Sequence, residues 1–529
     1  MNEHPNYLFV ICDQLRSDWL GCYGHPVVKT PHIDALAARG ALATDFHVAS
    51  PVCMPNRASL MTGRMPSVHG LRYNGCTLPT SANTFVDVLA AAGYSTASIG
   101  KSHLQPFTSN PPVHTDVAEG RLIEEAWKGD GSDYGLEQAE NYGQQQRFDF
   151  PVPYYGFQHV DMVTSHGDRC DGHYQQWFRE NCPDWEAMHD PANELPHNYS
   201  CPQAYRTPIP EEYYSTAWIG DRAIDYLGAR ASTNPDDPFF AFVSFPDPHH
   251  PFNPPGRYWD MYSPDQFSVD LPYSAHQNPT PPMQYLQELK RSGQGQFTPQ
   301  TAFCADDVQI RQAMALTAGM ITMIDDQVGR MVEALKANGQ YDNTVIVFTS
   351  DHGDYLGDFN LVLKGSMPFR SITQVPMIWS DPRSRSASEF NDLASTIDLP
   401  ASILARSTLV PYNGMQGKSF VDSMLSAASD GATGAAHRDE LLIEYNDGLP
   451  RLGFERPPRV RSLRTKAWRL TIYLDQDWGE LYDLREDPHE TNNLWHDHQF
   501  LDNKAEMMQR LANQLTAQMD GSPLSTRLA

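Results

Sequence analysis

The chain has few basic residues for its length. Its 529 residues include 39 lysines and arginines against 65 aspartates and glutamates, which gives a formal net charge of −26. Nucleic-acid-binding surfaces carry clustered positive charge, so this balance argues against a nucleic-acid partner. It also makes a polyanionic macromolecule an unfavourable partner unless the mouth of the site is locally positive.

The sequence also lacks paired cysteines and long apolar runs. Its eight cysteines are irregularly spaced, without a Cys-x-x-Cys unit, and therefore indicate neither a zinc module nor a disulfide framework. No apolar run approaches the roughly 20 residues that span a membrane. Met1 stands a few residues before the first apparent strand, which leaves no room for a signal peptide. We therefore expect a cytoplasmic protein that does not use a membrane.

Apolar runs that alternate with helical patterns predict an α/β fold. Buried strands are predicted at residues 7–12, 94–99, 238–245, 344–350 and 375–379. Helices are predicted at residues 30–37, 84–92 and 213–227 and around 321–335. Strands and helices in this order build a mostly parallel central sheet flanked by helices, and the length of the chain suggests a second domain.

The pattern changes after about residue 404. Short strands separated by turn signals are predicted at 440–445, 459–465 and 468–474, and an amphipathic helix follows at 503–518. We therefore divide the chain into a catalytic α/β domain at 1–405 and a smaller C-terminal antiparallel sheet and helix at 406–529. Within the first domain, residues 105–210 are rich in turn-forming residues with weak periodicity, and we interpret them as active-site insertions.

Several aromatic and histidine side chains of the insertion region allow two interpretations. They are Tyr154, Tyr155, His166, His173, Tyr174, Trp177 and Trp185. They either line a substrate pocket, because such side chains suit sugar or aryl groups, or they pack loops against the sheet. Packing is the more common fate, and we predict it for each of them.

Polar side chains stand where two predicted strands end. Asp13 and Gln14 follow the first strand, and Asp351 and His352 follow the strand at 344–350. Open α/β sheets bind their ligands at this end of the strands. The two aspartates would repel each other if left unpaired, and three oxygen-capable groups with one imidazole suit a divalent cation. The sequence therefore predicts one cation site, with Ca²⁺, Mg²⁺ and Mn²⁺ as candidates.

A cysteine motif precedes another predicted helix. The segment reads Cys53-Met54-Pro55-Asn56-Arg57, and a helical stretch follows at 58–64. A helix N-terminus offers unpaired N–H groups and a positive dipole end, both of which favour an anionic oxygen. A lone cysteine before a helix is otherwise a buried structural residue, so the surrounding motifs must decide.

Three further motifs carry basic residues. Gly100-Lys101-Ser102-His103-Leu104 follows the strand at 94–99, and side chains two residues apart point the same way, which suits a tetrahedral anion. Pro248-His249-His250-Pro251 follows the strand at 238–245, and we expect His250 to face elsewhere than His249. Lys364-Gly365 lies downstream of Asp351.

Together these motifs resemble those of the formylglycine-dependent sulfatases of the alkaline phosphatase superfamily. The Cys53-x-Pro55-x-Arg57 pattern is similar to their modification signature, in which the cysteine is oxidised to an aldehyde whose hydrate is the nucleophile. The segment at 479–494 resembles their C-terminal signature, so the resemblance covers nearly the whole chain. It implies an alkaline-phosphatase-like fold and the hydrolysis of sulfate monoesters of a carbohydrate or an aryl alcohol.

The resemblance also implies roles for single residues. The implied catalytic residues are Cys53, Arg57, Lys101, His103, His249 and Lys364, and the implied substrate-binding residues are Asn74, Lys101, His249 and Lys364. The implied ligands of the divalent cation, with Ca²⁺ as first choice, are Asp13, Gln14, Asp351, His352 and the modified Cys53. The implied maturation partner is a formylglycine-generating enzyme. The implied ligand is a small-molecule or saccharide sulfate ester. A homo-oligomer is compatible with the resemblance.

Two alternatives stay open at this point. Gln14, His352 and Asn74 resemble the phosphonate monoester hydrolases and phosphodiesterases of the same superfamily, whereas the Lys101 and His103 motif resembles the sulfatases. A relative that keeps the fold, binds anions and never acquires the aldehyde is the second alternative. A comparison of ester substrates distinguishes these possibilities.

Overall fold

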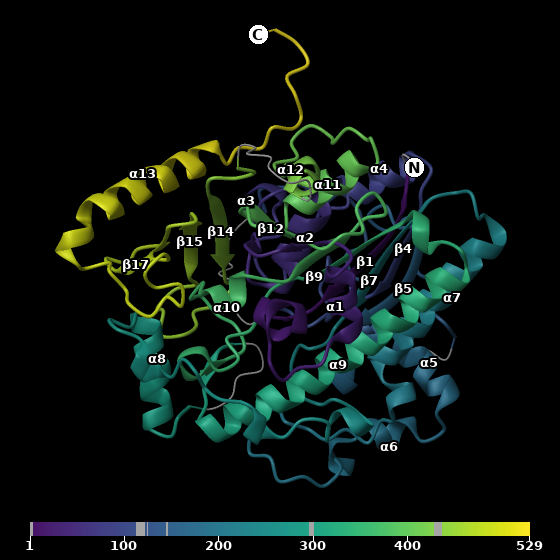
Figure 1. The fold of residues 1–529 in the computed structure, drawn as a ribbon, viewed down its shortest axis with the longest axis horizontal. Coiled ribbons are helices and arrows are strands. Elements are labelled where there is room, and N and C mark those ends of the chain that lie inside the picture. Colours follow the sequence, from purple (N-terminus) through teal and green to yellow (C-terminus); the bar gives the residue numbers. More distant parts are fainter. Residues whose placement is uncertain are drawn as a thin grey trace.

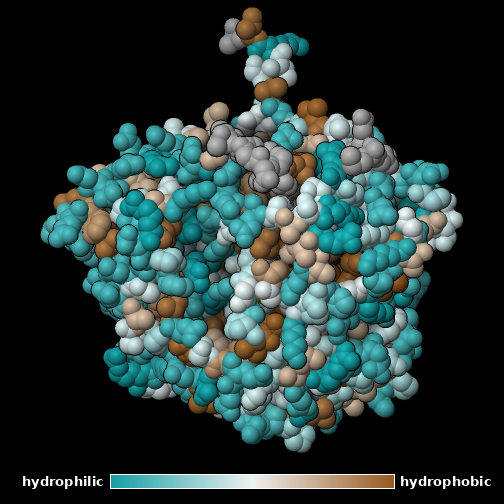
Figure 2. Space-filling model, in the orientation of Figure 1, coloured by the Kyte–Doolittle hydropathy of each residue, from teal (hydrophilic) through white to brown (hydrophobic). Residues whose placement is uncertain are grey.

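The computed structural model of the chain describes residues 4–112, 122–123, 125–143, 146–295, 301–427 and 436–528. Within them lie a nine-stranded central sheet between two layers of helices and a smaller four-stranded sheet with its own helix (Figure 1). This confirms the predicted α/β fold with a C-terminal antiparallel part. Figure 2 shows a surface on which hydrophilic residues predominate and hydrophobic ones are scattered.

The central sheet is mostly parallel. Its strands, in spatial order, are β12 (Ser388–Phe390), β2 (Ala41–Ala43), β11 (Met377–Ser380), β9 (Thr344–Ser350), β1 (Asn6–Cys12), β7 (Phe239–Phe245), β4 (Ser95–Gly100), β5 (His159–Thr164) and β6 (Asp171–Gly172). The five strands from β9 to β5 in this order are parallel, whereas β11 runs antiparallel to β9. Strand β1 is central and fully buried, as its continuous apolar run predicts.

Side chains alternate along β1 between two separate hydrophobic cores. Leu8 and Val10 belong to one core, together with residues of α1 (Pro31–Ala37), α5 (His173–Asn181), α7 (Ser215–Thr233) and α9 (Asp307–Ala337). Tyr7 and Phe9 belong to the other core, together with residues of α2 (Cys53–Thr62), α4 (Phe85–Ala91) and α11 (Asp398–Arg406). Helices thus cover both faces of the sheet, which leaves the ends of its strands for a site.

The smaller sheet is antiparallel and follows the order of the chain. It contains β14 (Leu441–Asn446), β15 (Arg459–Arg464), β16 (Trp468–Tyr473) and β17 (Gly479–Asp483). Helix α13 (Leu501–Ala517) packs on it, and its residues Met507 and Leu511 share a core with Leu463, Leu470 and Leu481. The predicted strands and final helix are therefore confirmed, and the fourth strand comes from the C-terminal signature.

Short elements complete the fold. They are β3 (Phe46–His47), α3 (Pro66–His69), α6 (Trp185–His189), α8 (Pro281–Arg291), β8 (Phe303–Cys304), β10 (Leu361–Val362), α10 (Arg370–Thr373), β13 (Ala394–Ser395) and α12 (Val421–Ala427). Among the helices of the described ranges, none is long and apolar enough to cross a membrane. Strands β5 and β6 were not predicted, because they lie inside the weakly periodic region 105–210 and β5 carries polar residues at His159 and Asp161.

Candidate active site

The pairing of β1 with β9 brings two carboxylates to one point. Cys12 is in register with Ser350, so Asp13 and Asp351 follow paired residues at the same edge of the sheet. The backbone N–H of Asp351 donates to the carbonyl of Cys12 at 3.1 Å. Both carboxylates are buried. The predicted meeting of the two strand ends is present in the structure.

Cys53 lies against these strand ends as the first residue of α2. Its Sγ is 3.2 Å from Nε2 of His352, 3.3 Å from Nζ of Lys364 and 3.8 Å from Oδ1 of Asp13. Burial and Asp13 raise the pKa of the Cys53 thiol, but Lys364, Lys101 and His352 outweigh them and lower it below its ordinary value. Position 53 is therefore built to hold a negatively charged atom.

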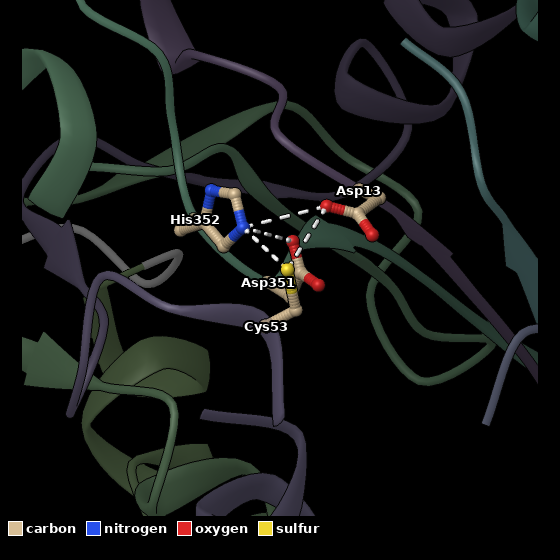
Figure 3. Close-up of side chains that lie close together, drawn as sticks. All are labelled: Asp13, Cys53, Asp351 and His352. Carbon is tan, nitrogen blue, oxygen red and sulfur yellow. Dashed lines mark hydrogen bonds and ion pairs between the residues drawn. The ribbon is translucent and has the colours of Figure 1, made fainter. Parts of the chain in front are cut away.

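Four side chains form a donor set that fits a divalent cation. Ligand atoms of Asp13, Cys53, Asp351 and His352 all lie within 4.8 Å of one another (Figure 3). Nδ1 of His352 donates to the carbonyl of Gly353 at 2.9 Å, which leaves Nε2 to face the cluster. Burial and Lys364 lower the pKa of His352, but Asp351 and Cys53 raise it above its ordinary value. The cluster thus attracts positive charge.

Gln14 stands at the rim of this cluster. Its backbone N–H donates to Oδ1 of Asp351 at 3.1 Å, and its Oε1 accepts from Nζ of Lys364 at 2.8 Å. Its amide nitrogen donates to Asp354 at 2.5 Å. The Oε1 atom of Gln14, which is the atom that would bind a cation, therefore accepts a hydrogen bond from Lys364 in this structure.

Two basic side chains neutralise the buried carboxylates. Nε of Arg57 donates to Oδ2 of Asp351 at 2.6 Å, and its Nη2 is 3.7 Å from Oδ2 of Asp13. Nζ of Lys101 contacts Asp13 directly. Arg57 is completely buried beneath the site, so it fixes the two carboxylates from below. Burial raises the pKa of Asp13, but Lys101, His249 and Arg57 hold it well below the ordinary value.

A row of histidines faces Lys364 and Lys101. The ring of His249 stacks between those of His166 and His250, at centroid distances of 3.7 and 3.9 Å. Nζ of Lys364 donates to Nε2 of His249 at 2.9 Å, and Nζ of Lys101 is 2.6 Å from Nε2 of His166. Burial, with His166 adding to it, lowers the pKa of His249 well below its ordinary value. Burial, with Lys101 adding to it, also lowers the pKa of His166, so His166 and His249 resist protonation and present neutral ring nitrogens to the two lysines.

Two predictions are corrected by this row. His250 does not face elsewhere, because its Nδ1 lies 3.2 Å from the amide nitrogen of Gln14. His166 is not a packing residue, because it contacts Lys101 and His249. The other aromatic and histidine side chains of the insertion region do pack: Tyr154, Tyr155, His173, Tyr174, Trp177 and Trp185 lie in or against the cores or make backbone contacts.

A cavity of about 670 Å³ opens above Cys53. His103, Asn74, His249 and Lys364 line it. The ring of His103 stacks on Phe107 at 3.8 Å, and burial together with Lys101 lowers the pKa of His103 well below its ordinary value. Asn74 accepts from the backbone N–H of Met54 at 3.3 Å. All the predicted site residues therefore lie in the cluster around Cys53 or in the wall of this cavity.

This combination defines a hydrolase of anionic esters. An activated position at a helix N-terminus, a cation-binding donor set and lysines with neutral histidines around a cavity are the parts that such chemistry requires.

Comparisons with known proteins give the family. The Sulfatase family model matches residues 5–408, and the model described as N-sulphoglucosamine sulphohydrolase, C-terminal, matches residues 357–518. The chain belongs to the sulfatase family. It is 26% identical over 495 residues to an arylsulfatase of Clostridium perfringens, covering 93% of this chain and 90% of that protein.

Two further comparisons match nearly the whole chain. A multifunctional alkaline phosphatase superfamily protein of Trinickia caryophylli is 27% identical over 530 residues, covering 92% of this chain and 91% of that one. The structure is similar to that of a phosphonate monoester hydrolase of Agrobacterium radiobacter, with a TM-score of 0.75, 23% identity and coverage of 99% and 98%. That likeness shows a shared fold.

Glu137 is a buried residue that the sequence did not reveal. Its carboxylate accepts from the backbone N–H groups of His103, Leu104 and Gln105 at 2.8, 2.9 and 3.1 Å. The hydroxyl of Tyr154 donates to the same group at 2.5 Å. His103 has a φ of 60°, a left-handed conformation that costs energy for a non-glycine residue. Glu137 therefore fixes the backbone that presents His103 to the cavity.

We expect Glu137→Gln to lower turnover without removing the reacting groups. The amide keeps one acceptor oxygen but points an NH₂ group at backbone donors, so the free energy of unfolding should fall by about 1–3 kcal/mol. The kcat should fall more than the KM rises, because His103 is displaced while Asn74, His249 and Lys364 keep their places in the cavity wall. Glu140→Gln is the control, since Glu140 is exposed and accepts from Ser109. Equal kcat values for the two variants would contradict the positioning role.

Proposed function

We propose that this protein hydrolyses sulfate monoesters with position 53 as nucleophile, after oxidation of Cys53 to formylglycine, and with one divalent cation. The observation that carries the proposal is the position of Cys53 Sγ, which lies between the cation donors and Nζ of Lys364. A formylglycine-generating enzyme is the maturation partner that this proposal requires.

The roles of the side chains follow from their contacts. The hydrated aldehyde supplies a hydroxyl that attacks sulfur, and a cation held by Asp13, Gln14, Asp351 and His352 would lower the pKa of that hydroxyl. Arg57 holds Asp351 in place from below. Lys364, which contacts both Cys53 and His249, offsets negative charge on the transferring group and on the departing ester oxygen.

Proton movements fall to the histidines. Nδ1 of His249 donates to the carbonyl of His250 at 2.6 Å, so Nε2 of His249 faces Lys364. Lys364 can then pass a proton toward the leaving oxygen. His103 is neutral, and no side chain among the described residues pairs with its buried Nδ1. We assign to His103 the role of accepting the proton of the second hydroxyl, whose loss expels sulfate and restores the aldehyde, because a bound anionic ester raises the pKa that burial and Lys101 have lowered.

A phosphonate monoester or phosphodiester activity is the second candidate. Gln14 and His352 favour it, because both lie at the cation cluster, and Asn74 favours it by lining the cavity. Sulfate monoesters remain our first choice. A sulfate monoester carries one negative charge spread over three nonbridging oxygens and has no second substituent on sulfur. Hydrogen-bond donors that lie as close to position 53 as Lys364 does can therefore surround the sulfate group.

We therefore expect an aryl sulfate to have a higher kcat/KM than an aryl phosphonate monoester or aryl phosphodiester with the same leaving group. Lys101→Ala should reduce sulfate turnover by about tenfold or more, because Asp13 loses its closest cation. The measurement is steady-state kinetics on all three esters. If sulfate is the poorest substrate and Lys101→Ala leaves its turnover unchanged, the phosphonate hydrolase replaces the sulfatase as the conclusion.

A further inference from the structure

His166 lies at the site although none of the predicted motifs contains it. It forms part of the wall of the cavity above Cys53, and its side chain is 19% exposed. Lys101, by contrast, is completely buried and does not belong to the cavity wall. Nζ of Lys101 contacts Asp13 and also lies 2.6 Å from Nε2 of His166. The imidazole of His166 therefore reaches the cavity where Lys101 itself does not.

The contact with Lys101 fixes the position of the proton on the His166 ring. The Lys101 ammonium can only donate, so Nε2 of His166 accepts from it. Burial, with Lys101 adding to it, lowers the pKa of His166 to about 3, and the ring is neutral. A neutral imidazole carries one proton, which is then on Nδ1. No hydrogen-bond partner of that Nδ1 lies among the described residues, so its N–H is available to a ligand.

Its neighbours hold the His166 ring in one orientation. The ring stacks on that of His249 at a centroid distance of 3.7 Å, with an angle of 13° between the two planes. The ring of Phe107 meets it edge-on at 6.4 Å, and Lys101 donates to its Nε2. These contacts keep the one N–H group of the ring in a constant direction, as an effective donor to a reacting group requires.

The backbone that carries His166 is also fixed. Nδ2 of the buried Asn253 donates to Oδ1 of the buried Asp168 at 2.6 Å, and the hydroxyl of Tyr214 donates to Oδ1 of Asn253 at 3.0 Å. Gly167 has a φ of 58°, and a Cβ at this position would lie 2.6 Å from Oδ1 of Asn253. Glycine is the residue that permits both this conformation and this close approach. The loop of His166 is therefore locked onto the loop that follows β7.

His166 stands close to the group that reacts at Cys53. Oδ1 of Asp13 is 3.8 Å from Sγ of Cys53, and Oδ2 of the same carboxylate is 3.7 Å from Nε2 of His166. On the stacked face of the ring, His249 accepts from Lys364, and Nζ of Lys364 is 3.3 Å from the same Sγ. At most two side chains separate His166 from Cys53 along each path. An ester attacked from position 53 therefore brings its oxygens near the His166 ring.

We propose that His166 binds the ester directly, with its Nδ1–H facing the cavity and donating to a nonbridging oxygen of the group under attack. The inference rests on the proposed function and adds to it a substrate contact that none of the sequence motifs contains. Lys101 acts through His166 here, because its hydrogen bond to Nε2 holds the proton on Nδ1. The donor is neutral, so the sulfate gains a hydrogen bond without a third cation beside Lys101 and Lys364.

The test compares His166→Phe, His166→Gln and His276→Phe. Phenylalanine keeps a ring in the stack but removes both hydrogen bonds, whereas glutamine keeps an acceptor for Lys101 and an N–H group for the ester. His276 is the matched control, because it is a buried histidine outside the cavity whose Nε2 lies 2.9 Å from the hydroxyl of Tyr482. Binding of an aryl sulfate is titrated calorimetrically in the Cys53→Ala protein, and KM and kcat are measured with Cys53 present. Thermal unfolding verifies that each variant is folded.

We expect His166→Phe to weaken aryl sulfate binding and to raise the KM by about tenfold, because a hydrogen bond to a charged oxygen is lost. His166→Gln should restore most of the affinity, and His276→Phe should lower the unfolding temperature with binding unchanged. Unchanged binding in His166→Phe, or an equal loss in His166→Gln or in His276→Phe, overturns the inference, since the His166 ring would then only pack.

The same titrations with an aryl phosphonate monoester separate this inference from the proposed function, because the nonbridging oxygens of both esters can accept from His166. An affinity for both esters that depends on His166, with faster turnover of the phosphonate, would support the contact and reject the sulfatase. Aryl sulfate hydrolysis with the same KM in His166→Phe and in the unaltered protein would do the reverse. Absence of binding by both esters overturns the inference.

Discussion

Asp351→Asn is expected to lose bound metal and turnover together, with kcat/KM falling at least about 100-fold. The Asp351 carboxylate belongs to the four-residue donor set, and its Oδ2 accepts from Arg57 at 2.6 Å. An amide oxygen is a weaker cation ligand than a carboxylate oxygen, and the substitution leaves the buried Arg57 with less negative charge beside it. The measurements are metal content by mass spectrometry and steady-state turnover of an aryl sulfate.

Loss of stability must be separated from loss of metal, since any buried arginine pair is costly to break. Asp381→Asn is the matched control, because Asp381 pairs with the buried Arg406 at 2.7 Å outside the site. Both variants should unfold at lower temperature, but Asp381→Asn should retain metal and kcat. Full activity of the unaltered protein after exhaustive chelation, with metal verified as absent, would refute the cation site. Reloading with Ca²⁺, Mg²⁺ or Mn²⁺ identifies the ion.

Much of this site could be predicted because it follows from strand ends. Continuous apolar runs predict β1 and β9, and the parallel register of the two strands then requires Asp13 and Asp351 to meet. Lys101 after β4 and His249 after β7 reach the site in the same way. Sequence position was informative wherever the preceding strand was apolar enough to recognise.

The missed residues show where that argument ends. His166 comes shortly after β5, as Lys101 comes after β4, but β5 lies near the sheet edge and carries polar residues, so neither the strand nor its end was predicted. Glu137 lies in no regular element, and nothing in its sequence surroundings marks a carboxylate that accepts three backbone N–H groups. His250 contacts Gln14 through a loop conformation that residue spacing cannot specify.

The second large effect concerns Cys53 itself. We expect peptide mass spectrometry of active protein to find, at position 53, a residue lighter than cysteine, as formylglycine is. The buried Sγ lies beside Lys364, His352 and Asp13, where a hydroxyl of the hydrated aldehyde would meet both the cation donors and a lysine. Cys53→Ala removes this nucleophile, so turnover should fall by roughly 10⁴-fold or more.

The controls for Cys53 must separate chemistry from packing. Cys304→Ala removes another buried thiol, in β8, whose Sγ contacts Gln287, and it should leave turnover unchanged while lowering the free energy of unfolding by a few kcal/mol at most. Cys53→Ala should keep its metal affinity within about tenfold, because Asp13, Asp351 and His352 remain. An unmodified thiol in fully active protein, or wild-type rates for Cys53→Ala, would exclude the formylglycine mechanism, because that mechanism requires the aldehyde at position 53.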